Sequence, residues 1–155
     1  MDDKSQSDNS KRKVKVLVVD DHPIVRRGLM QLINQEPDLL GCAQAEGAMQ
    51  ALDELKQQPF DLVVVDISLN EINGIQLTEK IRSLYPKLPV LIVTMHHEAV
   101  YCQRALRAGA SGYVMKNEAA EKIITAIRQL LSGKKYISET VMRNPLGQPH
   151  AEGWC

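Results

Sequence analysis

The chain is poor in cysteine and in aromatic residues. Its 155 residues include three cysteines, Cys42, Cys102 and Cys155. An odd number at such wide spacings fits neither a disulfide framework nor a CxxC metal site. We expect Cys42 and Cys102 to behave as small buried hydrophobic residues and Cys155 as a thiol in the tail. Aromatic residues make up only 4% of the chain, so the core must be built mainly from Val, Ile, Leu and Ala.

The sequence also lacks a segment with the properties of a membrane span or a signal peptide. Apolar runs such as VLVV and LVVV are four residues long, whereas a spanning helix needs about 20 apolar residues. The first residues, MDDKSQSDNSKRK, contain no apolar core of a signal peptide. We therefore expect a cytoplasmic protein that does not contact a membrane.

Neither sign of charge is in excess. Nineteen Lys and Arg balance nineteen Asp and Glu, for a formal net charge of +0, so no overall field attracts a polyanion. The basic clusters, Lys11 to Lys13, Arg26 with Arg27, and Lys134 with Lys135, are small and separate in the sequence. We expect the chain itself to show no sequence-specific DNA binding, because such binding needs an element that enters a groove.

The length allows one domain with short flanking segments, since domains hold about 100 to 200 residues. Residues 1–13 contain a single apolar residue among mixed charges, and we expect a disordered arm there. Residues 14–133 carry the periodic apolar pattern of one folded domain. Beyond Gly133 the pattern stops; a helix could begin at Lys134, but NPLGQPHAEGWC follows. We interpret residues 134–155 as a linker stub and an unstructured tail.

Short apolar runs in the domain alternate with segments whose apolar residues recur every three or four positions. Ala48, Ala51, Leu52 and Leu55, for example, share one helical face. Strands that are apolar on both sides belong to a parallel sheet with helices on both faces. The sequence therefore predicts a doubly wound α/β fold with a five-stranded parallel sheet. The expected strands are Val14–Val19, Leu39–Ala45, Leu62–Val65, Val90–Val93 and Tyr113–Met115.

Polar residues follow these strands where each apolar run ends. Asp20 and Asp21 follow the first run, Asp66 the third, Thr94 the fourth and Lys116 the fifth. Alone, each has an ordinary explanation as a helix cap or a solvated surface residue. Ligands of open α/β sheets, however, bind at the carboxyl ends of the strands, so these side chains should converge.

Three crowded carboxylates repel one another unless a cation neutralises them. Ligation by oxygen atoms with room for waters suits Mg²⁺. A metal-bound carboxylate beside a Lys and a Thr is also suited to accept a phosphoryl group. In such a transfer the protein mainly positions the phosphoryl group and neutralises its charge.

Four segments of the chain carry a family resemblance: VKVLVVDDHPIVRRGL, DLVVVDISLNEINGIQL, VLIVTMHHE and AGASGYVMKNEAAEKIITAI. Together they are similar to the receiver domain of bacterial two-component response regulators, over about residues 14–133. The resemblance implies a flavodoxin-like (βα)5 fold with strand order 2-1-3-4-5. It further implies that Asp66 is phosphorylated, and that Asp21, Asp66 and the main-chain carbonyl of Ser68 bind Mg²⁺. Asp20 would act through a metal-bound water.

The same resemblance assigns roles to the residues after the later strands. Thr94 and Tyr113 match the switch pair, and Lys116 matches the lysine that pairs with the phosphate. DDHPIVRRGL, GASGYVMKN and LLSGKKYISE are similar to regulators with a LuxR-type helix-turn-helix output domain. Many receivers have a Pro with a cis peptide bond at the position of Asn117. With Asn there, no cis bond is expected. We expect Asn117 to cap the last helix instead.

The function implied is a phosphorylation switch. A sensor histidine kinase would supply the phosphoryl group, and phosphorylation would be linked to homodimer formation. The domain would not be an enzyme, since it assists only its own phosphorylation and dephosphorylation. DNA would be contacted only through an output domain of some 60 residues that the chain lacks. The alternatives are a pseudo-receiver, acting as a constitutive interaction module, and a stand-alone enzyme on a small substrate.

Three histidines near the predicted site invite a metal or phosphohistidine interpretation, namely His22, His96 and His97. His22 opens a helix beside Pro23, and the other two lie in a loop where solvated polar residues are the default. We therefore assign none of them to the site, although His96 stands at its mouth, where it could influence access of water.

Overall fold

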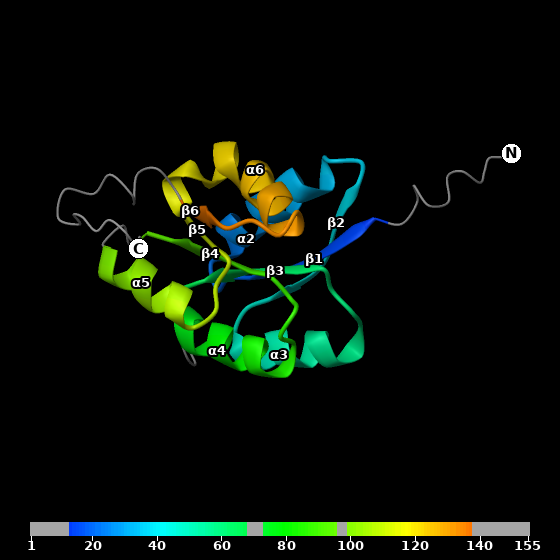
Figure 1. Cartoon of the computed structure of the whole chain (residues 1–155). Coiled ribbons are helices and arrows are strands. Elements are labelled where there is room, and N and C mark those ends of the chain that lie inside the picture. Colours follow the sequence, from blue (N-terminus) through cyan, green and yellow to red (C-terminus); the bar gives the residue numbers. More distant parts are fainter. Residues whose placement is uncertain (1–12, 68–72, 96–98, 138–155) are drawn as a thin grey trace, which may run out of the picture.

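The computed structural model describes residues 13–67, 73–95 and 99–137 (Figure 1). The strands are β1 (Val14–Val19), β2 (Leu39–Ala45), β3 (Leu62–Asp66), β4 (Val90–Thr94), β5 (Gly112–Met115) and β6 (Tyr136–Ile137). The helices are α2 (Pro23–Asn34), α3 (Ala48–Gln57), α4 (Gly74–Leu84), α5 (Ala99–Arg107), the 3₁₀ turn η1 (Lys116–Glu118) and α6 (Ala119–Leu131).

The strands form one parallel sheet in the order β2-β1-β3-β4-β5-β6. The predicted order 2-1-3-4-5 is confirmed, but the sheet has six strands where five were expected. In the sixth strand, Tyr136 and Ile137 pair with Gly112 and Tyr113 and cover the outer edge of β5. Gly133, with a φ of 91°, turns the chain back from α6 towards this edge.

The sixth strand lies just beyond Gly133, within the segment interpreted as a linker stub. No helix begins at Lys134, and two residues beyond the predicted domain boundary belong to the sheet. A two-residue strand shows no apolar alternation, and its pairing depends on backbone groups that any sequence supplies. Residues 138–155, like most of the predicted arm, lie outside the described residues, so the predicted boundaries stay predictions.

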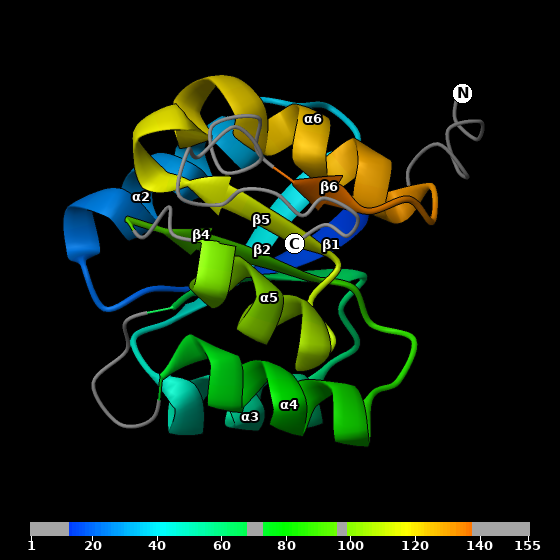
Figure 2. The same cartoon turned by 60° about the vertical axis from the view of Figure 1, so that its left-hand side comes forward.

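Helices cover both faces of the sheet, with α2 and α6 on one face and α3, α4 and α5 on the other (Figures 1 and 2). Successive strand side chains point to opposite faces. In β1, Leu17 and Val19 therefore join the core under α3, α4 and α5, while Val16 and Val18 join the core under α2 and α6. All four are fully buried, which explains why the strands are apolar on both sides.

The start of α4 packs closely against the end of β3, and this contact fixes the backbone of Asp66. Gly74 donates its amide to the carbonyl of Ile67 (2.8 Å), and the Thr78 hydroxyl donates to the carbonyl of Gly74 (2.7 Å). Asn73 and Gln76 form a reciprocal cap at the start of α4. A Cβ atom at residue 74 would lie 2.3 Å from the carbonyl oxygen of Asp66, so only glycine fits there without movement of β3.

We expect Gly74→Ala to destabilise the protein by about 1 to 3 kcal/mol, the usual effect of overpacking. The matched control is Gly28→Ala in α2, where a Cβ atom would meet nothing within 4 Å; it should stabilise the protein by up to about 1 kcal/mol through helix propensity. Urea unfolding followed by circular dichroism measures both. Equal effects of the two substitutions would contradict the close packing at Gly74.

Candidate functional site

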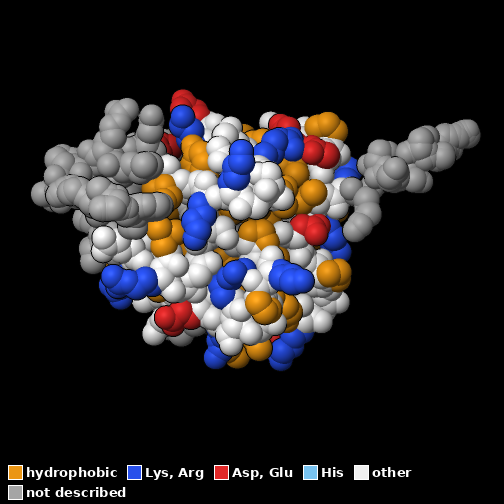
Figure 3. Space-filling view, viewed as in Figure 1, with side chains coloured by type: hydrophobic (Ala, Val, Ile, Leu, Met, Phe, Trp, Pro, Cys, Tyr) orange, Lys and Arg blue, Asp and Glu red, His pale blue; other side chains and the backbone are white. Residues whose placement is uncertain are grey.

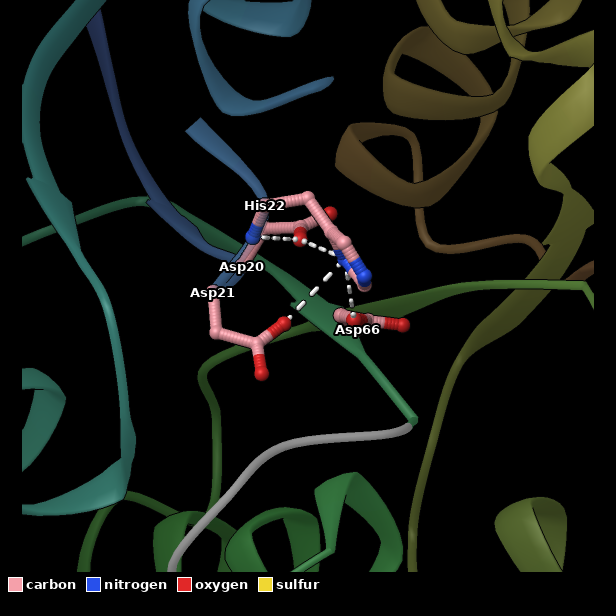
Figure 4. A group of neighbouring side chains, drawn as sticks. All are labelled: Asp20, Asp21, His22 and Asp66. Atoms are coloured by element: carbon pink, nitrogen blue, oxygen red, sulfur yellow. Dashed lines mark hydrogen bonds and ion pairs between the residues drawn. The ribbon is translucent and has the colours of Figure 1, made fainter. Parts of the chain in front are cut away.

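Three carboxylates lie together at the carboxyl end of the sheet (Figure 4). Asp20 and Asp21 follow β1, and Asp66 ends β3, the strand that pairs with β1. Asp20 is 1% and Asp66 is 2% exposed, while the Asp21 side chain is 15% exposed. The structure thus brings together the acidic residues that the strand ends predicted, two of them almost completely removed from solvent.

Local backbone contacts hold Asp20 in place. Its amide donates to the carbonyl of Ala45 at the end of β2 (3.0 Å), and its carbonyl accepts from the Arg26 guanidinium (2.7 Å). Its Oδ1 accepts from the amide of His22 (2.8 Å), the kind of local turn that Asp side chains favour. Pro23 then begins α2, as its fixed φ allows.

The Lys116 ammonium lies among the carboxylates. Its Nζ is 3.4 Å from Asp66 Oδ2 and 3.5 Å from Asp20 Oδ2, and its side chain is 9% exposed. It follows β5 in the η1 turn, two strands away from Asp66 in the sheet. One positive charge therefore faces two buried carboxylates, which leaves their negative charge only partly compensated.

The η1 turn changes the expected start of the last helix. Asn117 lies inside this turn and does not cap α6; Glu118 occupies the N-cap position without a side-chain cap bond. Glu121 does lie in the first turn, where its charge is favourable. The prediction for Asn117 was wrong because the helix begins one short turn later than the polar signal indicated.

Thr94 and Tyr113 are both fully buried. Thr94 ends β4, at the same end of the sheet as Asp66, and Tyr113 lies within β5. Tyr113 belongs to the core under α3, α4 and α5. Their roles as a switch pair stay predictions. Ser68, whose carbonyl was predicted to bind metal, lies outside the described residues.

His22 belongs to this cluster, which the sequence reasoning missed. Its Nδ1 lies 3.0 Å from Asp20 Oδ1, 3.1 Å from Asp21 Oδ1 and 3.7 Å from Asp66 Oδ2 (Figure 4). The sequence feature that could have identified His22 is its position directly after the two aspartates at the end of β1. His96 and His97 lie outside the described residues.

The residues at this site fit a divalent cation. Asp20 Oδ2 and Asp21 Oδ1 are buried and accept no hydrogen bond from the described residues. A buried carboxylate oxygen without a hydrogen bond is unfavourable unless a cation compensates its charge. Clustered carboxylate oxygens are the ligands that hard divalent cations prefer, so the site has the composition of a magnesium site.

Two surface hollows lie away from the acidic cluster. One, of about 770 Å³, is lined by Phe60, Tyr85 and their neighbours, and its lining includes none of the clustered aspartates. The other, of about 440 Å³, brings Arg82 and Lys87 next to Lys134 and Lys135. Lys134 and Lys135, one of the small basic clusters, thus have two further basic neighbours, and Figure 3 shows Lys and Arg side chains spread over one face.

None of the described helices is both long and apolar enough to cross a membrane.

The fold and the acidic site together define a class of protein. A parallel α/β sheet with carboxylates after β1 and β3 and a lysine after β5 is what the response-regulator resemblance implied. The family model of the response regulator receiver domain matches residues 16–128. The chain therefore belongs to the receiver domains of two-component response regulators.

Similar proteins are transcription regulators of the LuxR and NarL type. A LuxR-family response regulator of Aurantimonas sp. SI85-9A1 is 34% identical, with 84% of this chain and 94% of that chain covered and a TM-score of 0.81. The methanol utilization control regulatory protein MoxX of Paracoccus denitrificans is 37% identical, with 86% of this chain and 60% of MoxX covered.

RcsB is a third similar protein. Its isolated receiver domain from Salmonella enterica serovar Typhimurium, solved with the phosphomimetic BeF₃⁻, is 25% identical, with a TM-score of 0.79 and coverage of 85% and 98%. RcsB has also been solved as two dimers bound to two parallel DNAs. The present chain spans about 60% of the length of the curated relatives that it matches.

The crowding of charge predicts that Asp20→Asn stabilises the metal-free protein, because it removes one buried negative charge beside Asp66. We expect a gain of about 0.5 to 2 kcal/mol, typical of relief at a functional site, and a smaller further gain when Mg²⁺ is added. Thermal unfolding with EDTA and with Mg²⁺ measures both, with exposed Asp53→Asn as the control. A metal-free Asp20→Asn protein less stable than the parent would contradict this account.

Proposed function

We propose that this receiver domain accepts a phosphoryl group on Asp66 from a sensor histidine kinase in a Mg²⁺-dependent reaction. The observation that carries the proposal is the arrangement around Asp66. This buried carboxylate ends β3, and the Lys116 ammonium lies 3.4 Å from its Oδ2. Asp20 and Asp21 lie beside it and supply further oxygen atoms.

The reaction exchanges one bond to phosphorus for another. An Asp66 carboxylate oxygen forms the new P–O bond while the P–N bond of the donor phosphohistidine breaks, and the imidazole leaves. Lys116 pairs with a phosphoryl oxygen, and the Thr94 hydroxyl donates to another. Such transfers depend mainly on positioning and on neutralising charge on the phosphoryl oxygens.

Asp21 and Asp66 would hold the Mg²⁺ ion, together with the main-chain carbonyl of Ser68, and Asp20 would act through a bound water. When bound, Mg²⁺ supplies positive charge for the phosphoryl oxygens. The domain assists only its own phosphorylation and dephosphorylation, so it is not an enzyme acting on a separate substrate.

Phosphorylation would then change the surface of the domain. Thr94 would move in response to the new charge at Asp66, and Tyr113 would move in response to Thr94. The surface formed by α5, β5 and α6 would then bind a different partner. A homodimer linked to phosphorylation is the readout we propose. RcsB, solved as dimers on DNA, supports this assignment.

The parent protein would be a transcription regulator whose DNA contacts come from a helix-turn-helix output domain. The similar regulators are longer than this chain, in agreement with an input domain that works with a further domain.

Incubation with acetyl phosphate and Mg²⁺ should add one phosphate to the chain, a mass gain of ~80 Da. Asp66→Asn should abolish the gain, because an amide is a poor nucleophile, and Asp53→Asn on the surface of α3 should not. Intact-mass spectrometry measures all three proteins. A parent chain that stays unmodified would favour the pseudo-receiver, while labelled Asp66→Asn would move the phosphorylation site elsewhere.

Lys116→Ala should still bind Mg²⁺ but should no longer couple phosphorylation to dimer formation. The reason is that the ammonium near Asp66 Oδ2 would no longer hold the phosphoryl oxygens where Thr94 can reach them. Light scattering after size-exclusion chromatography, with and without acetyl phosphate, measures the dimer fraction. Lys80→Ala on the exposed face of α4 is the control; normal phosphorylation-linked dimerisation of Lys116→Ala would make Lys116 dispensable for the switch.

A further inference from the structure

The imidazole of His22 faces the acidic cluster from the start of α2 (Figure 4). Its Nδ1 is within 4.8 Å of one carboxylate oxygen from each of Asp20, Asp21 and Asp66, and these oxygens are as close to one another. The backbone amide of His22 already donates to Asp20 Oδ1, so the turn that positions this carboxylate also positions the ring. The ring is thus directed into the site by local backbone geometry.

No tautomer of the ring satisfies all the neighbours of Nδ1. With a hydrogen on Nδ1, the nitrogen can donate to Asp20 Oδ1 at 3.0 Å, but it then faces the Lys116 ammonium, another donor, at 3.2 Å. Without that hydrogen, Nδ1 can accept from Lys116, but two carboxylate oxygens, which are also acceptors, then lie 3.0 and 3.1 Å from it. A cation among these atoms would interact favourably with the lone pair and with both carboxylates.

The separations match those between ligands of one metal ion. Two ligands at neighbouring positions of an octahedral ion, each about 2.1 Å from the metal, lie about 3.0 Å apart. Nδ1 is 3.1 Å from Asp21 Oδ1, the proposed direct ligand, and 3.0 Å from Asp20 Oδ1, which would act through a bound water. The 3.7 Å separation from Asp66 Oδ2 is longer, so this carboxylate would have to move slightly.

A second observation points to a ligand in the same place. Asp20 is 1% exposed, and no residue in the described part of the chain donates a hydrogen bond to its Oδ2. The nearest cation to this oxygen among the described residues is Lys116 Nζ, 3.5 Å away, which is beyond an ordinary hydrogen bond for such a pair. The site therefore has both a buried carboxylate oxygen that accepts no hydrogen bond from the described residues and a ring nitrogen beside it.

We propose that His22 Nδ1 is a metal ligand, and that it makes this site prefer divalent transition metals such as Co²⁺, Ni²⁺ and Zn²⁺ over Mg²⁺. Imidazole nitrogen suits these ions, whereas Mg²⁺ binds mainly carboxylate, phosphate and water oxygens. This inference rests on the cation site of the proposed function and adds a nitrogen ligand to it. The side chain is 57% exposed, so its removal leaves the core intact.

The test is a comparison of metal affinities in the full chain. Co²⁺ binding is followed by its visible absorption and by calorimetry, and Mg²⁺ binding by calorimetry. His22→Ala should weaken Co²⁺ binding by at least about tenfold and change its absorption bands, while Mg²⁺ affinity changes by less than about threefold. The double variant His96→Ala/His97→Ala is the matched control and should bind both ions as the parent chain does.

Three results would overturn the proposal. Unchanged Co²⁺ affinity and spectrum in His22→Ala would show that the ring is not a ligand. An equal loss for Co²⁺ and Mg²⁺ would show that His22 only shapes the carboxylates, and tighter binding of both ions would show that it blocks the site. Labelling of Asp66 by acetyl phosphate and Mg²⁺, measured in parallel, separates these results from a failure of the proposed function.

Discussion

Two buried carboxylates at one end of a sheet are the constraint on which the rest of this structure depends. Asp20 and Asp66 are each no more than 2% exposed, and burial of charge is strongly unfavourable without a partner. The pairing of β1 with β3 forces them together. Cores on both faces of the sheet hold these strands rigidly, so the strain cannot be relieved by separation of the strands. Lys116 and a bound cation are then the available means of compensation.

The fold was predictable because its strands are buried on both faces. Leu62–Val65 and Val90–Val93 are apolar without interruption, which distinguishes a covered parallel strand from an amphipathic one. The parts that were missed lack such a signal. β6 is two residues long and pairs through its backbone. The helix α6 begins later than predicted because Asn117 lies in the η1 turn. Local propensity does not determine where such a turn ends and the helix begins.

The candidate site was predictable for the same reason, since strand ends determine where Asp20, Asp66 and Lys116 come together. His22 was missed because its place does not follow from a strand. It depends on a turn in which Asp20 Oδ1 accepts from the backbone amide of His22, and such turns appear in sequence only as one more polar residue. The residues at the strand ends could be identified from the sequence pattern, but the direction of the His22 ring could not.

The same packing indicates which element a phosphorylation switch would move. Tyr113 belongs to the same core cluster as residues of α5, so a movement of its ring would change the packing of α5. Within Tyr101–Arg107 of α5, the fully buried side chains are the small Cys102 and Ala105. By contrast, α6 buries the larger Ile123, Ile127 and Leu130. Apolar area buried sets the strength of anchoring, and within Tyr101–Arg107 the fully buried part of this area is small, with Tyr101 and Leu106 only partly buried against the core. A change of charge at Asp66 that moved Tyr113 would therefore act on the contacts of Cys102 and Ala105 in this shared core.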